Sequence, residues 1–275
     1  MTIVIQCTDQ IGLVTSITGV LAKLGINILS MREYVDVVGN RFFTRIEIVP
    51  FKDVQRLERY LTAVLPVNAS CTVIPVHEKR IIVLATKEYH CLSDILVRHH
   101  FKTLGAAVQV VIANHQHLND ITGRFNVHFV HVTHENKSKE QFEYELANII
   151  DQYAFDYIVL AKFMRILSPQ FVEKYFGKII NIHHSFLPAF VGAHPYKQAF
   201  ERGVKLIGAT AHFVTNDLDE GPIIAQQTIA VNHSFTLPKI VNAGKEIETA
   251  VLARALQLVM EDRVFVYQNK TVVFE

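Results

Sequence analysis

The sequence predicts an α/β protein of two domains, residues 1–77 and residues 78–275. In the first domain, strand and helix patterns follow one another in the order βαββαβ, which is typical of a small ferredoxin-like fold. From residue 80 on, apolar strand patterns alternate with helix patterns, and this alternation favours a doubly wound, mostly parallel sheet. A short charged segment at residues 76–80 marks the boundary.

Each element of the first domain has a local signal. Apolar residues at spacings of three and four begin at Leu13, and Gly25 stands where such a helix is expected to end. Asp53 is predicted to cap a second helix, because its side chain can accept a hydrogen bond from the first turn. The predicted strands are residues 2–7, 26–36, 41–49 and 71–75.

The second domain opens with a continuous apolar strand at residues 80–85, a pattern typical of sheets covered on both faces. The elements predicted after it are helices at 92–104, 139–153 and 237–261, strands at 108–113, 127–132 and 157–161, further strands that start at residues 179, 208 and 223, and a terminal hairpin of 264–267 with 271–274.

Three polar residues stand near the ends of the later strands. Asn181 and His183 are two residues apart in one strand, so their side chains point to the same face. Asp219 belongs to an acidic turn between the next two strands. Because ligands of open α/β sheets bind at strand ends, an amide, an imidazole and a carboxylate are predicted to converge there.

Several motifs in this region follow the order of a known family. They are Asn-Ile-His at 181–183, Ser-x-Leu-Pro at 185–188, Gly-Ala-Thr-x-His-Phe-Val at 208–214 and Leu-Asp-x-Gly-Pro-Ile-Ile-x-Gln at 218–226. This series resembles the folate-dependent formyltransferase fold. The doubled histidine His183-His184 and the sequence Phe-Val-Gly-Ala-His-Pro-Tyr at 190–196 resemble the formyltetrahydrofolate deformylases in particular.

The resemblance implies hydrolysis of 10-formyltetrahydrofolate to formate and tetrahydrofolate. In that chemistry, Asn181 donates a hydrogen bond to the developing oxyanion and protonated His183 donates beside it. Asp219 orients or deprotonates the attacking water. Folate is then the substrate and the small-molecule partner, and no cofactor is implied.

The folate also requires a slot for its pterin ring. Residues 162–167 resemble the pterin-edge loop of the family, which implies substrate contacts by Met164, Arg165, Ile166 and Leu167. The alternative is an ordinary βα loop in which Arg165 reaches into solvent. The acidic turn is expected to close the other side, and the predicted substrate-binding set is completed by His212, Thr215 and Asp217.

The first domain resembles the ACT domain, a small amino-acid-sensing module. The positions where that family binds its ligands imply Asp9, Gly12 and Asn27 as effector-binding residues. Thr8 stands where deformylases have proline, and Ile26 where a second glycine is expected. We therefore favour an oligomerisation module that pairs through its edge strands, with an amino-acid effector as the alternative. The expected assembly is a homo-oligomer.

Composition argues against several other classes of protein. The net charge of +1 is spread along the chain, so neither a nucleic-acid nor a membrane partner is predicted. No apolar run reaches the roughly 18 residues of a membrane span. Three cysteines without a Cys-x-x-Cys pair fit reduced thiols, so a cytoplasmic location is expected. Among 14 histidines no zinc spacing occurs, and no metal is predicted.

Other functions stay open at this point. The first βα turn, residues 86–92, contains no glycine, so a close backbone cradle for a phosphate is not expected. This argues against a phosphorylated amine as the formyl acceptor. A formyltransferase that uses another small amine and a non-catalytic amino-acid sensor are the alternatives to the hydrolase. Within the second domain, Cys91 is either a nucleophile or a small buried side chain.

Overall fold

The chain forms two compact units, and the computed structural model describes residues 1–189 and 195–275. The first unit consists of Met1–His77, Asp262–Phe265 and Val272–Glu275, and the second of Glu78–Glu261 and Val266–Thr271. The sequence predicts a second domain of residues 78–275, whereas Asp262–Phe265 and Val272–Glu275 cluster with the first unit. Residues 190–194, in the deformylase-like motif at 190–196, lie outside the described residues.

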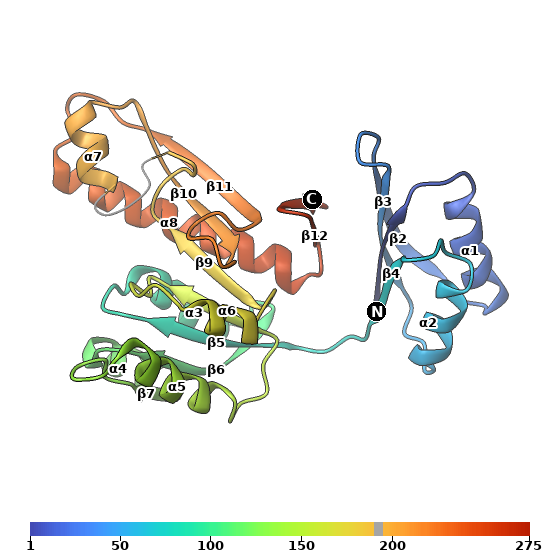
Figure 1. Cartoon of the computed structure of the whole chain (residues 1–275), viewed down its shortest axis with the longest axis horizontal. Helices are drawn as coiled ribbons and strands as arrows, with labels where there is room; N and C mark the ends of the chain where they lie inside the picture. The colour runs from blue at the N-terminus through green and yellow to red at the C-terminus, as the bar shows by residue number, and fades with distance from the viewer. Residues whose placement is uncertain (190–194) are drawn as a thin grey trace. The chain divides into compact units, whose positions relative to one another are not determined.

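The first unit contains a four-stranded antiparallel sheet of order β2-β3-β1-β4, with two helices packed on one face (Figure 1). Its elements are β1 (Thr2–Thr8), α1 (Leu13–Lys23), β2 (Ile28–Asp36), β3 (Arg41–Ile48), α2 (Val54–Thr62) and β4 (Ser70–Ile74). As predicted, Asp53 caps α2 and accepts the Arg56 N–H at 3.0 Å. Alternating residues of β1 pack against the apolar face of α1. The β1 residues are Ile3, Ile5 and Cys7, and the α1 residues are Leu13, Ile17 and Leu21.

The second unit contains a seven-stranded sheet. Its elements up to β8 are β5 (Lys79–Ala85), α3 (His90–His100), β6 (Ala106–Ala113), η1 (Gln116–Leu118), α4 (Asn119–Arg124), β7 (Phe129–His131), α5 (Lys139–Ile150) and β8 (Tyr157–Ala161). They are followed by α6 (Pro169–Lys174), β9 (Ile179–His183), α7 (Pro195–Arg202), β10 (Leu206–Phe213), β11 (Ile223–Ala230) and α8 (Leu237–Met260). A two-stranded sheet of β12 (Val264–Tyr267) and β13 (Lys270–Val273) ends the chain.

The strand order β11-β10-β9-β8-β5-β6-β7 defines where a ligand is expected. The five strands from β9 to β7 pair in parallel, whereas β10 is antiparallel to both of its neighbours. The chain leaves β5 toward β6 on one side and returns to β8 on the other. The carboxyl ends of β5 and β8 therefore form a topological switch point. The predicted mostly parallel, doubly wound sheet is confirmed.

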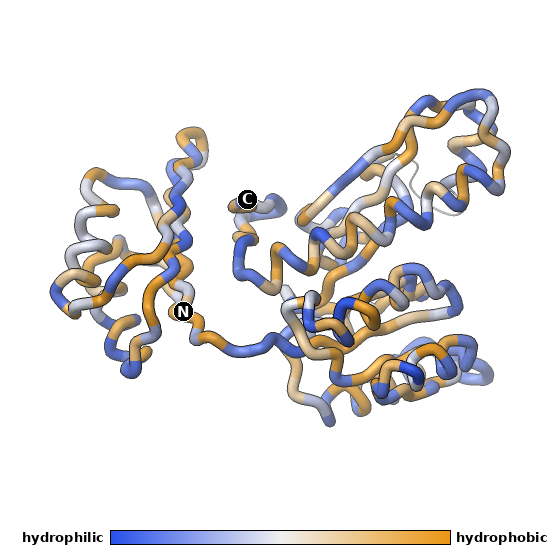
Figure 2. The backbone as a smooth tube through the Cα atoms, turned by 180° about the vertical axis from the view of Figure 1, so that it is seen from behind, coloured by the Kyte–Doolittle hydropathy of each residue, from blue (hydrophilic) through white to orange (hydrophobic). Residues whose placement is uncertain are grey.

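The parallel strands are hydrophobic along much of their length, because helices cover both faces of such a sheet (Figure 2). One core cluster joins β5, β6 and β8 to α5 through Ile82, Leu84, Val110, Ile112, Phe142, Leu146, Ile158 and Leu160. Helix α8 alternates between hydrophilic and hydrophobic residues and packs against β10, β11 and α3. This packing brings α8 next to the strands that carry the candidate site.

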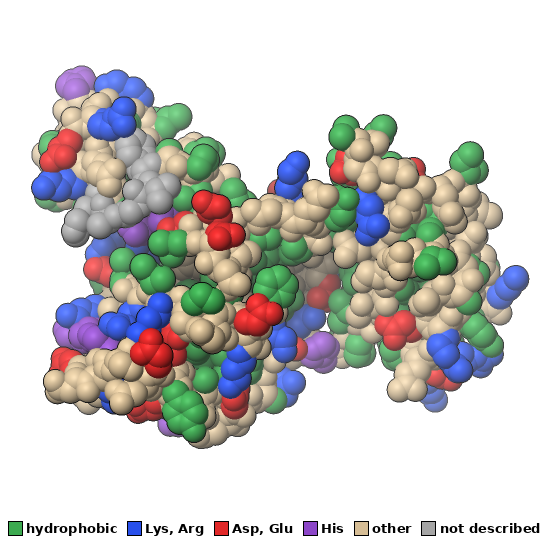
Figure 3. Space-filling model, viewed as in Figure 1, with side chains coloured by type: hydrophobic (Ala, Val, Ile, Leu, Met, Phe, Trp, Pro, Cys, Tyr) green, Lys and Arg blue, Asp and Glu red, His purple; other side chains and the backbone are tan. Residues whose placement is uncertain are grey.

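Charges are mixed on the surface. On the face that Figure 3 shows, basic and acidic side chains are interspersed over both units, in keeping with the net charge of +1. Within residues 1–189 and 195–275, no helix combines the length and the apolar character needed to cross a membrane.

Candidate active site

Asn181 and His183 lie on β9, beside the antiparallel strand β10. The register pairs Asn181 with His212 and His183 with Thr210. Asn181 Nδ2 lies 3.2 Å from His212 Nε2, and His212 Nδ1 lies 2.8 Å from the carbonyl oxygen of Phe213. Because a carbonyl only accepts, the proton of neutral His212 is on Nδ1, and Nε2 accepts from the Asn181 amide. His212 therefore orients Asn181.

Asp219 reaches the same place from the turn between β10 and β11. Its backbone has a left-handed φ of 59°, a conformation that aspartate adopts more readily than most residues. Its Oδ1 lies 3.2 Å from His183 Nδ1 and 3.8 Å from His212 Nε2. Gly221 is required two residues later, since a Cβ there would lie 1.8 Å from the Phe213 carbonyl oxygen. The Asp-x-Gly turn thus places one carboxylate beside two imidazoles.

The electrostatics keep Asp219 ionised. Burial raises the pKa of the Asp219 carboxyl, but the hydrogen bond and charge of His183 outweigh burial and hold that pKa below its ordinary value. With Nδ1 directed at Asp219, the Nε2 atom of His183 is buried without a hydrogen-bond partner in the described part of the chain. A buried polar atom of this kind at a cavity wall is suited to meet a ligand.

A cavity of about 310 Å³ opens in front of these side chains. Asn181, His183 and Asp219 line it together with the four residues of the predicted pterin loop, Met164, Arg165, Ile166 and Leu167. Met164 and Ile166 are 58% and 63% exposed although they are apolar. An apolar rim beside a few convergent polar groups is the usual composition of a site for a flat organic ligand.

Arg165 lines the cavity and also has a ring contact of its own, whereas His212, Thr215 and Asp217 do not line the cavity. The Arg165 guanidinium lies over the Phe142 ring, 5.1 Å from its centroid. The Thr215 hydroxyl donates to the carbonyl oxygen of Asp217 at 3.2 Å and so closes the acidic turn. Neither Thr215 nor Asp217 is among the residues that line the cavity, and Asp217 is exposed. Their contact with a substrate stays a prediction.

Comparisons with known proteins agree with this order of motifs. A family model described as "Formyl transferase" matches residues 79–256, and one described as "ACT domain" matches residues 1–64. A formyltetrahydrofolate deformylase of Haemophilus influenzae is 47% identical over 268 residues, which cover 98% of this chain and 96% of that protein. The chain belongs to the formyltetrahydrofolate deformylase family.

Solved structures of deformylases have the same fold as this chain, and that of a transformylase shares the fold over part of the chain. A formyltetrahydrofolate deformylase from Pseudomonas syringae superimposes with a TM-score of 0.95 at 39% identity, over 100% of this chain and 94% of that one. A glycinamide ribonucleotide transformylase 1 from Symbiobacterium toebii gives a TM-score of 0.69 at 30% identity, over 72% of this chain and 95% of that one. The resemblances to the deformylases and to the ACT domain are confirmed.

Glu143 supports the predicted pterin loop, although Glu143 is not among the residues predicted from the sequence. It lies on α5 with 7% exposure, and its carboxylate accepts the Ser168 N–H at 2.8 Å and the Ser168 hydroxyl. Ser168 in turn caps α6 by accepting the Phe171 N–H at 3.2 Å. The end of the loop at Leu167 is therefore fixed to α5. Its only signal in the sequence is a glutamate next to apolar Phe142.

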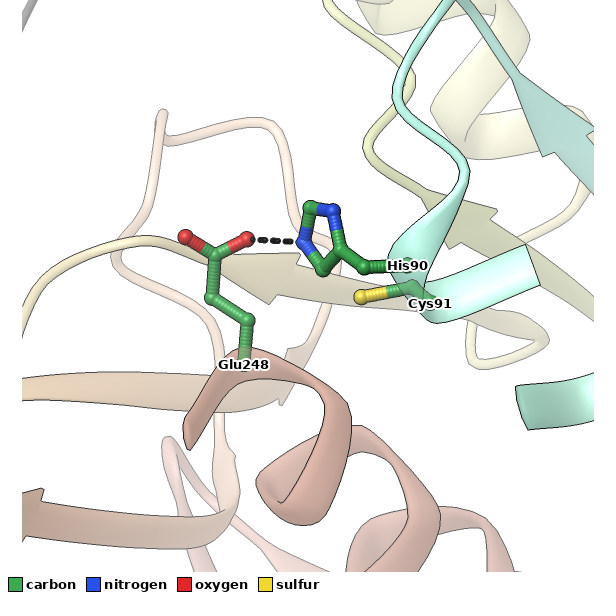
Figure 4. A group of neighbouring side chains, drawn as sticks. All are labelled: His90, Cys91 and Glu248. Carbon is green, nitrogen blue, oxygen red and sulfur yellow. Dashed lines mark hydrogen bonds and ion pairs between the residues drawn. The ribbon is translucent and has the colours of Figure 1, made fainter. Parts of the chain in front are cut away.

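A second buried carboxylate, Glu248 of α8, holds a network beside the site. It is 1% exposed and accepts from His90 Nε2 at 2.8 Å and from the Tyr196 hydroxyl at 2.5 Å, with Lys162 Nζ at 3.2 Å. Figure 4 shows His90 reaching Glu248 from α3, next to Cys91. Burial raises the pKa of Glu248, but these donors outweigh burial and lower it to about 2.

The sequence itself contains a signal for this network. Glu248 follows Ile247 and precedes Val251 and Leu252 on the buried face of α8. A charged residue at a core-facing helix position requires a partner. One turn earlier, a Cβ at Gly244 would lie 2.2 Å from the Tyr196 ring, so glycine makes room for that ring.

His90, Cys91 and Glu248 have ligand atoms within 4.8 Å of one another and form a candidate metal cluster among the described residues. The donor set does not favour a cation, because the Lys162 ammonium already contacts the carboxylate. Burial raises the pKa of the Cys91 thiol, whereas ligation and nucleophilic attack both require the thiolate. The predicted absence of a metal stays a prediction, and Cys91 is described as a buried side chain.

The lowered pKa of His184 predicts that the stability of the protein depends on pH. Burial, followed by the positive charges of Lys162 and His183, lowers the pKa of His184 from 6.5 to about 4. The unfolded chain therefore binds this proton below about pH 6.5, and the folded chain only below about pH 4. The folded protein therefore keeps its full stability above about pH 6.5. Its free energy of unfolding falls as the pH drops from about 6.5 to about 4. The expected loss due to His184 is about 2 kcal/mol between about pH 7.5 and pH 5.

Urea unfolding of the second unit at these two pH values measures this loss. His184→Gln should lose about 2 kcal/mol less on acidification than the unmodified protein. His233→Gln, at an exposed histidine of the same unit, should behave like the unmodified protein. An equal pH dependence of all three proteins would show that His184 is not the source.

The three predicted effector residues lie around α1 in the first unit. Gly12 has a left-handed φ of 89° at the start of the helix, and Asp9 precedes it, with its N–H bonded to the Asn40 carbonyl at 3.1 Å. Asn27 follows the other end of α1. The 11 helical residues span about 16 Å, so one copy of the domain does not bring Asn27 to Asp9 and Gly12. Effector binding stays a prediction.

Proposed function

We propose that this protein hydrolyses 10-formyltetrahydrofolate to formate and tetrahydrofolate. The proposal rests mainly on one observation, that Asn181, His183 and Asp219 line the same cavity. The loop of residues 164–167 lines that cavity as well. Membership of the deformylase family supports the substrate, since the relatives that share nearly the whole chain bear that name.

The mechanism begins with a water that the Asp219 carboxylate orients and deprotonates. Its oxygen attacks the N10-formyl carbon, and negative charge develops on the formyl oxygen. The Asn181 amide has two N–H groups, of which one bonds His212, so the other is available to donate to this oxygen. Protonated His183 donates to it from Nε2 while its Nδ1–H stays on Asp219.

The tetrahedral intermediate then collapses. The bond between the formyl carbon and N10 breaks, its electron pair goes to the nitrogen, and the His183–Asp219 pair supplies the proton that the nitrogen takes. The formic acid that results loses its hydroxyl proton to water, and formate and tetrahydrofolate leave. Every step uses side chains of this chain and water, so we propose that no cofactor is needed.

The first domain is proposed to regulate or assemble the enzyme. The match to an ACT domain at residues 1–64 supports an amino-acid effector or a homo-oligomer. We also propose a cytoplasmic location, on the grounds of the folate substrate and three cysteines without a disulfide among them. The boundary at residues 77 and 78 is proposed to separate regulation from catalysis.

An assay without any amine tests the function. The purified protein is incubated with 10-formyltetrahydrofolate, and formate and tetrahydrofolate are both followed. The expected result is release of the two products in equal amounts. Formyl transfer that begins only after a small amine is added would contradict the hydrolase. It would favour a formyltransferase, the second candidate, which the fold shared with a transformylase supports. No turnover with any acceptor would favour a sensor.

A further inference from the structure

A second cavity, of about 500 Å³, adjoins the catalytic pocket within the second unit. His184 and Met164 line both cavities. The second cavity is therefore a direct neighbour of the pocket in which the reaction is proposed to occur. The function proposed above gives it no role.

Lys162 supplies a buried positive charge to this second cavity. It directly follows β8 with a φ of 60°, a left-handed conformation that lysine rarely adopts and that is concentrated at ligand sites. Its side chain is 8% exposed, and Glu248 is its one ion-pair partner in the described part of the chain. Because an ammonium group has three N–H donors, two remain for a ligand.

The other charges of the cavity favour a small anion. Three ammonium groups and two carboxylates line it, 3 − 2 = +1 in total, and they are Lys162, Lys197, Lys245, Glu88 and Glu248. Both carboxylates are already engaged, Glu88 by Lys245 at 2.7 Å and Glu248 by its network. An anion in the cavity would meet donors rather than unpaired carboxylates.

We propose that the second cavity binds formate, with the Lys162 ammonium as its principal donor and His184 as the wall shared with the catalytic pocket. The inference rests on the proposed function, which makes formate the small anion that forms beside His184. A separate site lets formate leave the reacting carbon while tetrahydrofolate still occupies the pterin slot. Formate release then precedes tetrahydrofolate release.

Binding of formate is tested without turnover. ¹³C-labelled formate is titrated into the folate-free protein and followed by NMR line broadening, with sodium chloride added to keep the ionic strength constant. Because formate has three heavy atoms, about millimolar affinity is the most to expect. Saturable binding that acetate and chloride displace more weakly is the expected result. Failure to saturate, or equal displacement by chloride, would mean an adventitious ion only and would overturn the proposal.

Two variants separate Lys162 from the general charge of the cavity. Lys162→Met should weaken formate binding at least about tenfold, which corresponds to one charge-assisted hydrogen bond. Lys197→Met removes a positive charge from the same cavity at a side chain that is 63% exposed, and it should leave the affinity within about twofold. Equal affinities in the two variants would contradict the assignment.

A further variant protects the test against misfolding. If Lys162→Met leaves Glu248 without enough pairing to fold, the double variant Lys162→Met/Glu248→Gln removes both charges of the pair together. The glutamine oxygen still accepts from His90 and Tyr196, and loss of formate binding is expected again. Retained binding in a folded double variant would overturn the role of Lys162.

Failure of formate binding can be distinguished from failure of the proposed hydrolase function. Formate release from the folate without formate binding at Lys162 would defeat this inference alone. Saturable, Lys162-dependent binding without formate release in the assay would leave an anion site in a protein with another activity. In kinetics of the active enzyme, added formate should inhibit noncompetitively toward the folate, since it occupies a different cavity.

Discussion

Replacing Asp219 by asparagine should lower kcat by a factor on the order of 10²–10⁴ while the affinity for the folate changes little. The asparagine side chain keeps the shape of aspartate but cannot accept a proton from water at neutral pH. It also removes the negative charge that lies 3.2 Å from His183 Nδ1. Both losses act on the reaction, whereas the loop of residues 164–167 that is proposed to bind the substrate stays intact.

Steady-state kinetics and the dissociation constant of a non-hydrolysable folate give the two quantities separately. Glu220→Gln is the matched control, because Glu220 is the exposed neighbour in the same turn and should keep full activity. If Asp219→Asn lowers folate affinity and kcat by the same factor, Asp219 is a binding residue and not part of the reaction.

Replacing Asn181 by alanine should lower kcat by about 10²–10³, or roughly 3–4 kcal/mol of transition-state stabilisation. The variant removes the neutral N–H donor directed at the formyl oxygen, and it leaves Nε2 of His212 without its 3.2 Å partner. Asn181→Asp should be at least as inactive, because a carboxylate has the same size but no N–H to donate.

The measurement is kcat at saturating folate, with thermal unfolding to verify that each variant is folded. Asn148→Ala, at an exposed position of α5, is the control and should be fully active. Full activity of Asn181→Ala would mean that the oxyanion is stabilised elsewhere, and the proposed mechanism would be wrong.

Local patterns were sufficient to predict most of the fold. The β-branched run at Ile179 and the alternation of strands and helices are strong signals, and β9 and the parallel sheet follow them. Helix α4 was not predicted, because its six residues, Asn-Asp-Ile-Thr-Gly-Arg, contain one apolar side chain and a glycine. Short helices of this kind depend on their neighbours rather than on periodicity.

The three residues proposed to be catalytic were indicated by the sequence, whereas the groups around them were not. The order of motifs indicated Asn181, His183 and Asp219, and the structure places them on one cavity. Glu143 and Glu248 escaped because their partners are distant in the sequence: Ser168 lies 25 residues from Glu143, and His90 lies 158 residues from Glu248. Burial of a carboxylate is a tertiary property, and sequence spacing alone does not show what pairs with it.

The carboxyl end of the chain completes the first unit. Phe265 packs edge-on against Phe43 with ring centroids 5.9 Å apart, and Phe274 lies 5.4 Å from Phe265. During synthesis, Phe43 is made early, yet its aromatic partners leave the ribosome only with the final residues of the chain. The core between Ile3 and Val73 is made early and can pack first, whereas the ring of Phe43 gains these partners only after the second domain has been translated.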